Sequence, residues 1–204
     1  MDFQEPSASV GGFIFQLSIV RVLVRLIDEQ AVGKSGLPGF QLRGEMTVTT
    51  PSKPTYEQAQ LHLQVYDLRR EAKLRQARDW FFKNYFATNL DEGMKITAPM
   101  TEGGAYFMQV VSYWENACAL LNYGLLHEDL FFSTSGEFYG VWERIKPVVD
   151  EGRKKFVNQL FAANLEEAAK KYESWIEKRS PGHIAAMREF SKQIQAQVKS
   201  AKAA

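Results

Sequence analysis

One segment constrains the fold more than any other: residues 106–132, which read YFMQVVSYWENACALLNYGLLHEDLFF. Between residues 103 and 126 the only charged side chain is Glu115. With successive residues about 100° apart, as in an α-helix, the apolar positions form one broad face. We therefore predict a helix over residues 101–123 that ends at Gly124, a typical C-terminal capping residue. Its predicted apolar face consists of Phe107, Val110, Val111, Trp114, Ala117, Cys118, Leu121 and Leu125.

The opposite half of this helix carries Glu115 and Asn116 side by side. It lacks the Lys and Glu residues that stud a solvent-facing helix surface, so the helix is predicted to be central and packed on both sides. A carboxylate buried there needs a cationic partner or several hydrogen bonds. Arg153 lies at the edge of the apolar face of the next long helix, and we predict a structural ion pair between Glu115 and Arg153. A catalytic or ligand-binding Glu115 and a solvent-exposed Glu115 are the alternatives.

The rest of the chain from residue 55 is also predicted to be helical. Thr55 and Gln58 resemble a capping box, as do Thr134 and Glu137. Pro147 is expected to kink or break the helix that contains it. The predicted segments are a long helix over 55–89, a break at 91–99, a short turn at 127–132, and helices over 136–160, 164–178 and 184–198. The fold class is therefore all-α: an irregular bundle of about five to six helices over residues 55–200, with a frayed tail at 201–204.

The first 54 residues are predicted to form an apolar helical arm and a connector. Residues 31–54 are rich in Gly, Pro, Ser and Thr, which is typical of a loop. Arg21 and Arg25 interrupt the apolar run at 10–27, so we do not expect it to span a membrane. Such a helix must bury its surface against its own body, a second copy, a protein partner or a membrane surface. The candidate interaction residues of the arm are Phe13, Ile14, Leu17, Val20, Val24 and Ile27.

Charge is distributed unevenly, although the formal net charge is only +1. Residues 69–83 carry six basic side chains, and residues 101–143 carry six acidic ones with no Lys or Arg. We expect the two segments to neutralise each other across a helix contact. The alternative is a basic face for anionic lipid or nucleic acid. The chain lacks a recognisable nucleic-acid-binding module, which disfavours nucleic acid as the partner.

The single cysteine, Cys118, excludes an intrachain disulfide and fits a reducing, cytoplasmic location, with peripheral membrane attachment as the alternative. No metal site or cofactor is predicted, because none of the three histidines has a Glu three positions before it as in di-iron helical bundles. The GKS at 33–35 lacks the Gly that a phosphate-binding loop requires five positions earlier. The chain is therefore not expected to be an enzyme.

The central segment resembles a known family. WENACALLNYGLLHEDLFF followed by GVWERIKPVVDEGR is similar to the uncharacterised bacterial proteins that contain the domain of unknown function 4760. The resemblance covers residues 69–161 and implies a small helical protein, in some members with an amino-terminal membrane segment. It implies no activity. The positions that carry it are Glu115, Asn116, Gly124, Leu125, Asp129, Trp142 and Arg153.

The function expected from these features is that of a non-catalytic protein for protein–protein interaction or assembly, acting with a protein partner or by self-association through the amino-terminal arm. The first alternative is a peripheral membrane protein anchored by residues 10–27. The second alternative is an enzyme with a cleft formed at Glu115 and Arg153.

Overall fold

The computed structural model describes residues 53–203, and the predicted arm at residues 10–27 lies outside the described residues. The described part is all helical, which confirms the predicted fold class. It holds eight helices in place of the five or six expected. They are α2 (Tyr56–Arg69), α3 (Ala72–Asn84), α4 (Leu90–Ile96), α5 (Glu102–Asn122), α6 (Glu128–Thr134), α7 (Glu137–Lys155), α8 (Ala163–Arg179) and α9 (His183–Ala203).

The higher number of helices comes from the segment before α5. The predicted long helix over 55–89 is divided in two, because Arg70 ends α2 and the Glu71 carboxylate caps α3 by accepting a hydrogen bond from Leu74 N. The predicted break at 91–99 instead contains α4, which Asn89 caps in the same way. The capping box of Thr55 and Gln58 at the start of α2 is confirmed.

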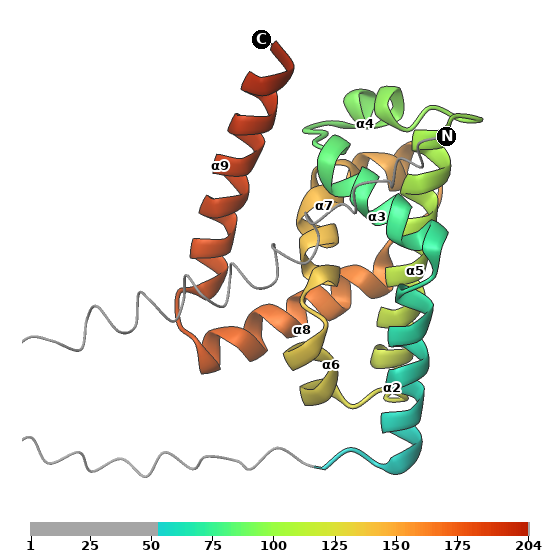
Figure 1. Ribbon diagram of the computed structural model, residues 1–204, viewed down its shortest axis with the longest axis vertical. Helices are drawn as coiled ribbons and strands as arrows, with labels where there is room; N and C mark the ends of the chain where they lie inside the picture. Colours follow the sequence, from blue (N-terminus) through green and yellow to red (C-terminus); the bar gives the residue numbers. More distant parts are fainter. Residues whose placement is uncertain (1–52, 204) are drawn as a thin grey trace, which may run out of the picture. The chain divides into compact units, whose positions relative to one another are not determined.

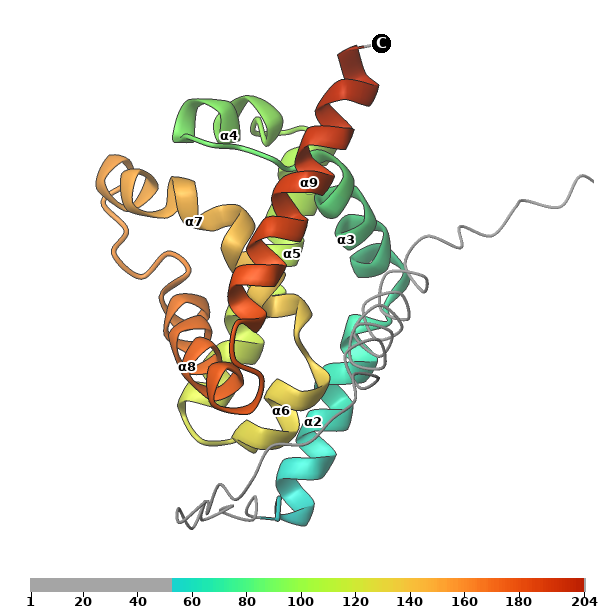
Figure 2. The same cartoon turned by 90° about the vertical axis from the view of Figure 1, so that its left-hand side faces the viewer.

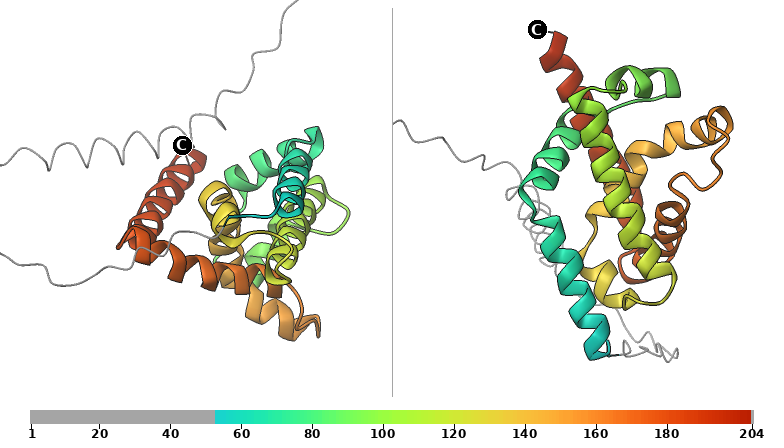
Figure 3. Two further views of the ribbon diagram at one scale, coloured as in Figure 1. Left: turned by 90° about the horizontal axis from the view of Figure 1, so that it is seen from below. Right: turned by 90° about the vertical axis from the view of Figure 1, so that its right-hand side faces the viewer.

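Helix α5 (Figure 1) is the centre of the body and lies between α3 and the α7–α8 pair (Figure 2 and the right view of Figure 3). Thr101 caps its first turn, and Gly124 follows its end with a φ of 73°, a conformation that glycine adopts without strain. Leu125 is half exposed, since it follows Gly124 and no longer continues the helical face. The rest of the predicted apolar face is buried: Phe107, Val110, Val111, Trp114, Ala117, Cys118 and Leu121.

The predicted second packing surface of α5 is present over only part of its length. Helix α8 packs against α5 at the level of Glu115. Met108, Ser112 and Tyr123, which share that half of the helix, are exposed. Their lack of charge therefore marks a surface that is uncharged but open to solvent.

The sequence predicted that Pro147 would kink or break its helix, and the break does not occur, since α7 continues through Pro147. Proline removes one backbone donor, but buried contacts along α7 on both sides of it, including Ile145 and Val149, hold the helix in place. The capping box predicted from Thr134 and Glu137 is absent, since α7 begins after Gly136 without a side-chain cap. Glu137 is instead partly buried, and its carboxylate accepts a hydrogen bond from Trp114 Nε1.

Helix α9 leans out from the end of α8 (Figure 1 and the left view of Figure 3). Its first turn is fastened to the body by Ile184, which is buried. The helix extends to Ala203, into the tail that was predicted to fray. Helix α2 lies along the edge of the body, at the end away from α4 and from the C-terminal end of α9 (Figure 2).

Candidate functional site

Glu115 caps the start of α8 from outside. Its Oε1 accepts hydrogen bonds from the backbone N and the side-chain Nδ2 of Asn164, at 2.9 and 2.8 Å, and its Oε2 accepts one from Leu165 N at 2.9 Å. These are the second and third residues of α8, whose backbone donors have no partner within the helix. The residue that would normally cap them is Ala162, which has no polar side chain. Glu115 therefore performs the work of a capping residue across a contact between two helices.

The ion pair predicted between Glu115 and Arg153 is not formed. Arg153 Nη1 binds Glu166 Oε2 at 2.8 Å, and its Nε donates to the carbonyl of Phe161 at 3.0 Å. The reason is that the uncapped start of α8 supplies closer donors for Glu115 than the guanidinium does. Both residues still act on the first turn of α8, and together they hold the α7–α8 connection against α5.

Asn116, the other half of the sequence pair, is exposed on α5. Cys118 is buried in the core, and burial, with the Glu115 charge adding to it, raises the pKa of its thiol well above the usual value. A protonated buried thiol is a packing group and a poor nucleophile. Neither Glu115 nor Arg153 lines the groove between α8 and α9 that is described below.

A partly buried polar cluster that the sequence did not single out is centred on Glu137, in the first turn of α7. Its Oε2 accepts from Arg69 Nη2 at 2.6 Å, and its Oε1 accepts from Arg78 Nε at 2.5 Å and from Trp114 Nε1 at 3.3 Å. Arg78 Nη2 also binds Oε2. One carboxylate thereby joins α2, α3, α5 and α7. The expected neutralisation of the basic segment by the acidic one is found here, for Arg69 and Arg78.

Electrostatics keeps Glu137 ionised. Burial on its own would raise the pKa of this carboxyl, but the hydrogen bonds and charges of Arg78 and Arg69 outweigh it and hold the pKa below the usual value. The sequence contained a signal for this cluster in the opposite charges of residues 69–83 and 101–143. The apparent capping box of Thr134 and Glu137 obscured it.

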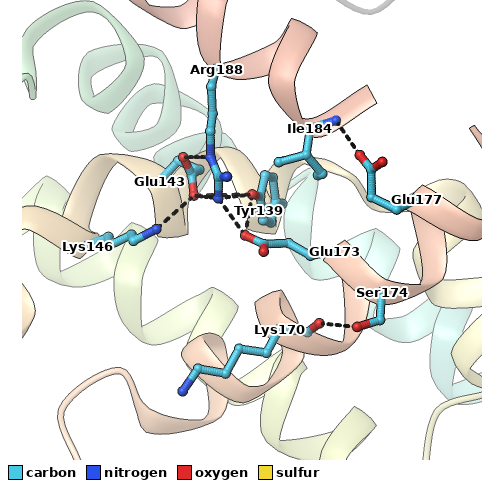
Figure 4. A network of polar contacts seen from close by, with 9 residues as sticks. All are labelled: Tyr139, Glu143, Lys146, Lys170, Glu173, Ser174, Glu177, Ile184 and Arg188. Atoms are coloured by element: carbon cyan, nitrogen blue, oxygen red, sulfur yellow. Dashed lines mark hydrogen bonds and ion pairs between the residues drawn. The ribbon is translucent and has the colours of Figure 1, made fainter. Parts of the chain in front are cut away.

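A second network fastens α9 to α7 and α8 (Figure 4). Arg188 of α9 binds both oxygens of Glu143, at 2.9 and 3.0 Å, and Oε1 of Glu173 at 2.6 Å. It also donates to the hydroxyl of buried Tyr139 at 3.0 Å, and that hydroxyl donates to Glu173 at 2.7 Å. Burial, followed by the hydrogen bond to Glu173, raises the pKa of Tyr139, so the phenol stays neutral. The network therefore connects α7, α8 and α9.

An open groove of about 550 Å³ lies beside this network, between α8 and the first half of α9. Glu173 and Glu177 line it, but Glu173 is bound to Arg188 and Glu177 accepts from the backbone N of Gly182 and Ile184. Both carboxylates are thus engaged in positioning α9. Over residues 53–203 there is also no group of three or more His, Cys, Asp and Glu side chains arranged to hold a metal ion.

His62 gives the body a predicted dependence on pH. It packs against Phe131, its Nε2 lies 3.1 Å from Thr134 Oγ1, and its Nδ1 is buried without a partner. Burial lowers the pKa of His62, so below about pH 6.5 the unfolded chain binds a proton that the folded chain disfavours. Stability should therefore fall as the pH falls through this range.

The measurement is urea unfolding at pH 7.5 and pH 5.5 for the wild type and His62→Gln, which keeps a polar group but does not titrate. We expect the variant to lose less stability between the two pH values, by a few tenths to about 1 kcal/mol. An equal loss in both proteins would show that His62 does not carry this dependence.

Large apolar side chains are exposed at several places on the body, with one group on α2 and another on the connection between α7 and α8. On α2 they are Tyr56, Leu63, Tyr66 and Leu68, whose exposed fractions are 72%, 61%, 47% and 60%. On the connection between α7 and α8 they are Phe156, Val157 and Leu160, at 63%, 87% and 79%. Exposed apolar clusters of this kind mark interaction surfaces. Within residues 53–203, no helix has both the length and the hydrophobicity needed to cross a membrane.

Comparison with curated proteins and with solved structures found no match. Comparison with known families matched residues 54–172, more than half of the 204-residue chain, to the Domain of unknown function (DUF4760). The matched segment runs from the residue before the α2 cap to Tyr172 in α8, so it contains the Glu115 cap and the Glu137 cluster and excludes α9. The chain therefore belongs to the DUF4760 family, as the resemblance of its central segment implied.

Proposed function

We propose that the protein is a non-catalytic assembly protein that associates with a second copy of itself through the outer face of α2. We define this face as Tyr56, Leu63, Tyr66 and Arg70. The observation that carries the proposal is the exposure of its three large apolar side chains on one helix at the edge of the body. On a helical wheel Tyr56, Leu63 and Tyr66 fall within about 80° of one another.

Helix α2 has little internal support. It is 14 residues long, and Val65 is its only buried residue. A helix of this length is marginal in water without packing on an apolar face. Its outer face, which points away from Val65, therefore gains stability when another surface covers it.

The outer face of α2 is complementary to itself. In an antiparallel pair related by a two-fold axis near Leu63, the Leu63 side chains of the two copies meet, as an isologous interface requires. Arg70 of each copy then lies over Tyr56 of the other, a favourable cation–aromatic arrangement. With a net charge of only +1, two copies also repel each other weakly.

A non-catalytic role is supported by the way in which the body uses its carboxylates. Glu115 caps α8, Glu137 joins four helices, and Glu143 holds α9. Each forms bonds that position backbone or neighbouring helices. The predicted amino-terminal arm, with Phe13, Leu17 and Val24, is a second candidate contact in the same assembly, because its connector leads directly into α2.

The proposal predicts a mass in light scattering coupled to gel filtration of twice the 23.3 kDa chain. The double substitution Leu63→Glu with Tyr66→Glu should produce a monomer, since it places charges in the apolar contact. Met108→Glu, an equally exposed apolar residue on α5, is the matched control and should remain dimeric. A wild-type chain that is monomeric across the whole concentration series would refute the proposal.

Removal of the first 30 residues separates the contribution of the arm. A dimer that persists without the arm but is lost with the α2 substitutions assigns the contact to α2. A dimer that is lost on truncation and unaffected by the α2 substitutions assigns it to the arm and contradicts the α2 interface.

A further inference from the structure

The end of α7 departs from the usual chemistry of a helix terminus. Asn158 N donates to Arg153 O at 3.0 Å and Val157 N lies 3.4 Å from Lys154 O, which is the pattern of a Schellman motif. In this motif the first residue after the helix cap has a left-handed conformation, and this residue is usually Gly. Here it is Val157, with a φ of 51°. A β-branched residue in this conformation is strained.

Packing within the body does not offset the strain at Val157. The Val157 side chain is 87% exposed, so it makes little packing contact within the body to compensate. Phe156 and Leu160, the other large apolar residues of the same turn, are also mostly exposed. Departures from local structural rules that stability does not explain concentrate at functional surfaces.

The charged residues around this turn indicate which kind of surface it contacts. Lys154 and Lys155 directly precede it and are exposed, and neither forms an ion pair with another of the described residues. The next ten residues, 156–165, carry no charge. Of the nearby acidic groups, Asp150 lies 3.8 Å from Arg153 Nη1, Glu151 accepts from Leu90 N, and Glu166 is bound to Arg153 and Lys170. Among the described residues, Lys154 and Lys155 are thus cations without an acidic partner at the edge of an apolar turn, although Lys155 Nζ contacts Met94 Sδ at 3.4 Å. The exposed Asp150 carboxylate lies one turn earlier in α7.

The turn projects from the body and is not a groove. It lies at the left edge of the molecule in Figure 2 and at the right edge in the right view of Figure 3. A projecting apolar tip bordered by lysines is suited to an interface in which apolar groups enter the acyl region and cations remain among anionic headgroups.

We propose that residues 154–160, the α7–α8 turn, dock the protein on an anionic lipid surface. Phe156, Val157 and Leu160 enter the interface, and Lys154 and Lys155 contact the headgroups. Two lysines and three apolar side chains give weak, reversible binding that salt opposes, because exposed charges are screened. This inference does not depend on assembly through α2.

The test is flotation of the full chain with vesicles of phosphatidylcholine alone and of phosphatidylcholine mixed with phosphatidylserine. We expect flotation with the anionic vesicles only, and a decrease as salt is added. Val157→Gly should weaken binding on the order of tenfold, since it removes an inserted apolar side chain. The same variant should unfold about 2–4 °C higher, because glycine relieves the strain.

Met100→Gly is the matched control. Met100 is also left-handed, with a φ of 66°, and fully exposed, but it lies in the α4–α5 connection. This substitution should stabilise the fold in the same way and leave flotation unchanged. Absence of flotation, or equal flotation of the wild type and Val157→Gly, would overturn the proposal. The second outcome would assign lipid binding to another segment, and a change in oligomeric mass on Val157→Gly would indicate a protein contact instead.

Discussion

Replacement of Glu137 by alanine is expected to destabilise the body more than any other single carboxylate substitution. It leaves the partly buried Arg69 and Arg78 without this counter-ion and removes the acceptor of Trp114 Nε1. Removal of one partner from a fully buried ion pair costs about 3–5 kcal/mol. We expect about 2–4 kcal/mol here, because the side chains of Arg69, Arg78 and Glu137 remain 21%, 16% and 15% exposed. Urea unfolding measures the loss. Glu167→Ala, at an exposed ion pair with Lys171, is the control and should cost less than about 1 kcal/mol.

Glu137→Ala is also expected to change how the stability of the body depends on pH in the acid range. Because the folded-state pKa of Glu137 is lowered, its contribution is present above the usual carboxyl pKa and is lost as the pH falls through the folded-state value. Glu137→Ala should therefore lose stability less steeply than the wild type below about pH 4.5. A variant that behaves like the Glu167→Ala control in both measurements would contradict the account of the cluster.

The second largest effect is expected at Glu115. Glu115→Ala removes three hydrogen bonds at the start of α8 and leaves the backbone donors of Asn164 and Leu165 without acceptors. Loss of a helix cap costs about 0.5–2 kcal/mol, and hydrogen bonds to a charged group are worth more than neutral ones. We expect a loss of about 2–3 kcal/mol.

Hydrogen exchange localises this effect. The amide protons of Asn164 and Leu165 should lose protection in Glu115→Ala before the rest of α8 does. Asn116→Ala, at the exposed neighbouring position, should change stability by less than about 0.5 kcal/mol. Unchanged protection at Asn164 and Leu165 would show that Glu115 does not cap α8.

The local elements were largely predictable from the sequence. The buried face of α5, the Thr55 capping box and the glycine after α5 all follow from spacing and residue type. The break between α2 and α3 was not predictable, because Glu71 reads as an ordinary helix former and acts as a cap only once α3 packs on α5. The break predicted at Pro147 does not occur, because buried residues on both sides of the proline hold α7 together as one helix.

The polar sites show where prediction from one sequence ends. Glu115 was predicted to connect α5 to Arg153 of α7, but it binds the start of α8 instead. The missing cap at Ala162 becomes apparent only when the start of α8 is located. Glu137 was missed, since its arginines lie 59 and 68 positions earlier in the chain. The left-handed Val157 has no sequence signal, because a Schellman end is expected at glycine.

The central claim is assembly through the outer face of α2, and its most direct test is a cross-link at Leu63. In Leu63→Cys the new thiols of two copies should lie together near the two-fold axis, whereas native Cys118 is buried and unavailable. Mild oxidation should then convert most of the protein to a covalent dimer, with Met108→Cys remaining monomeric under denaturing conditions. Equal or absent cross-linking in the two variants would contradict the α2 interface.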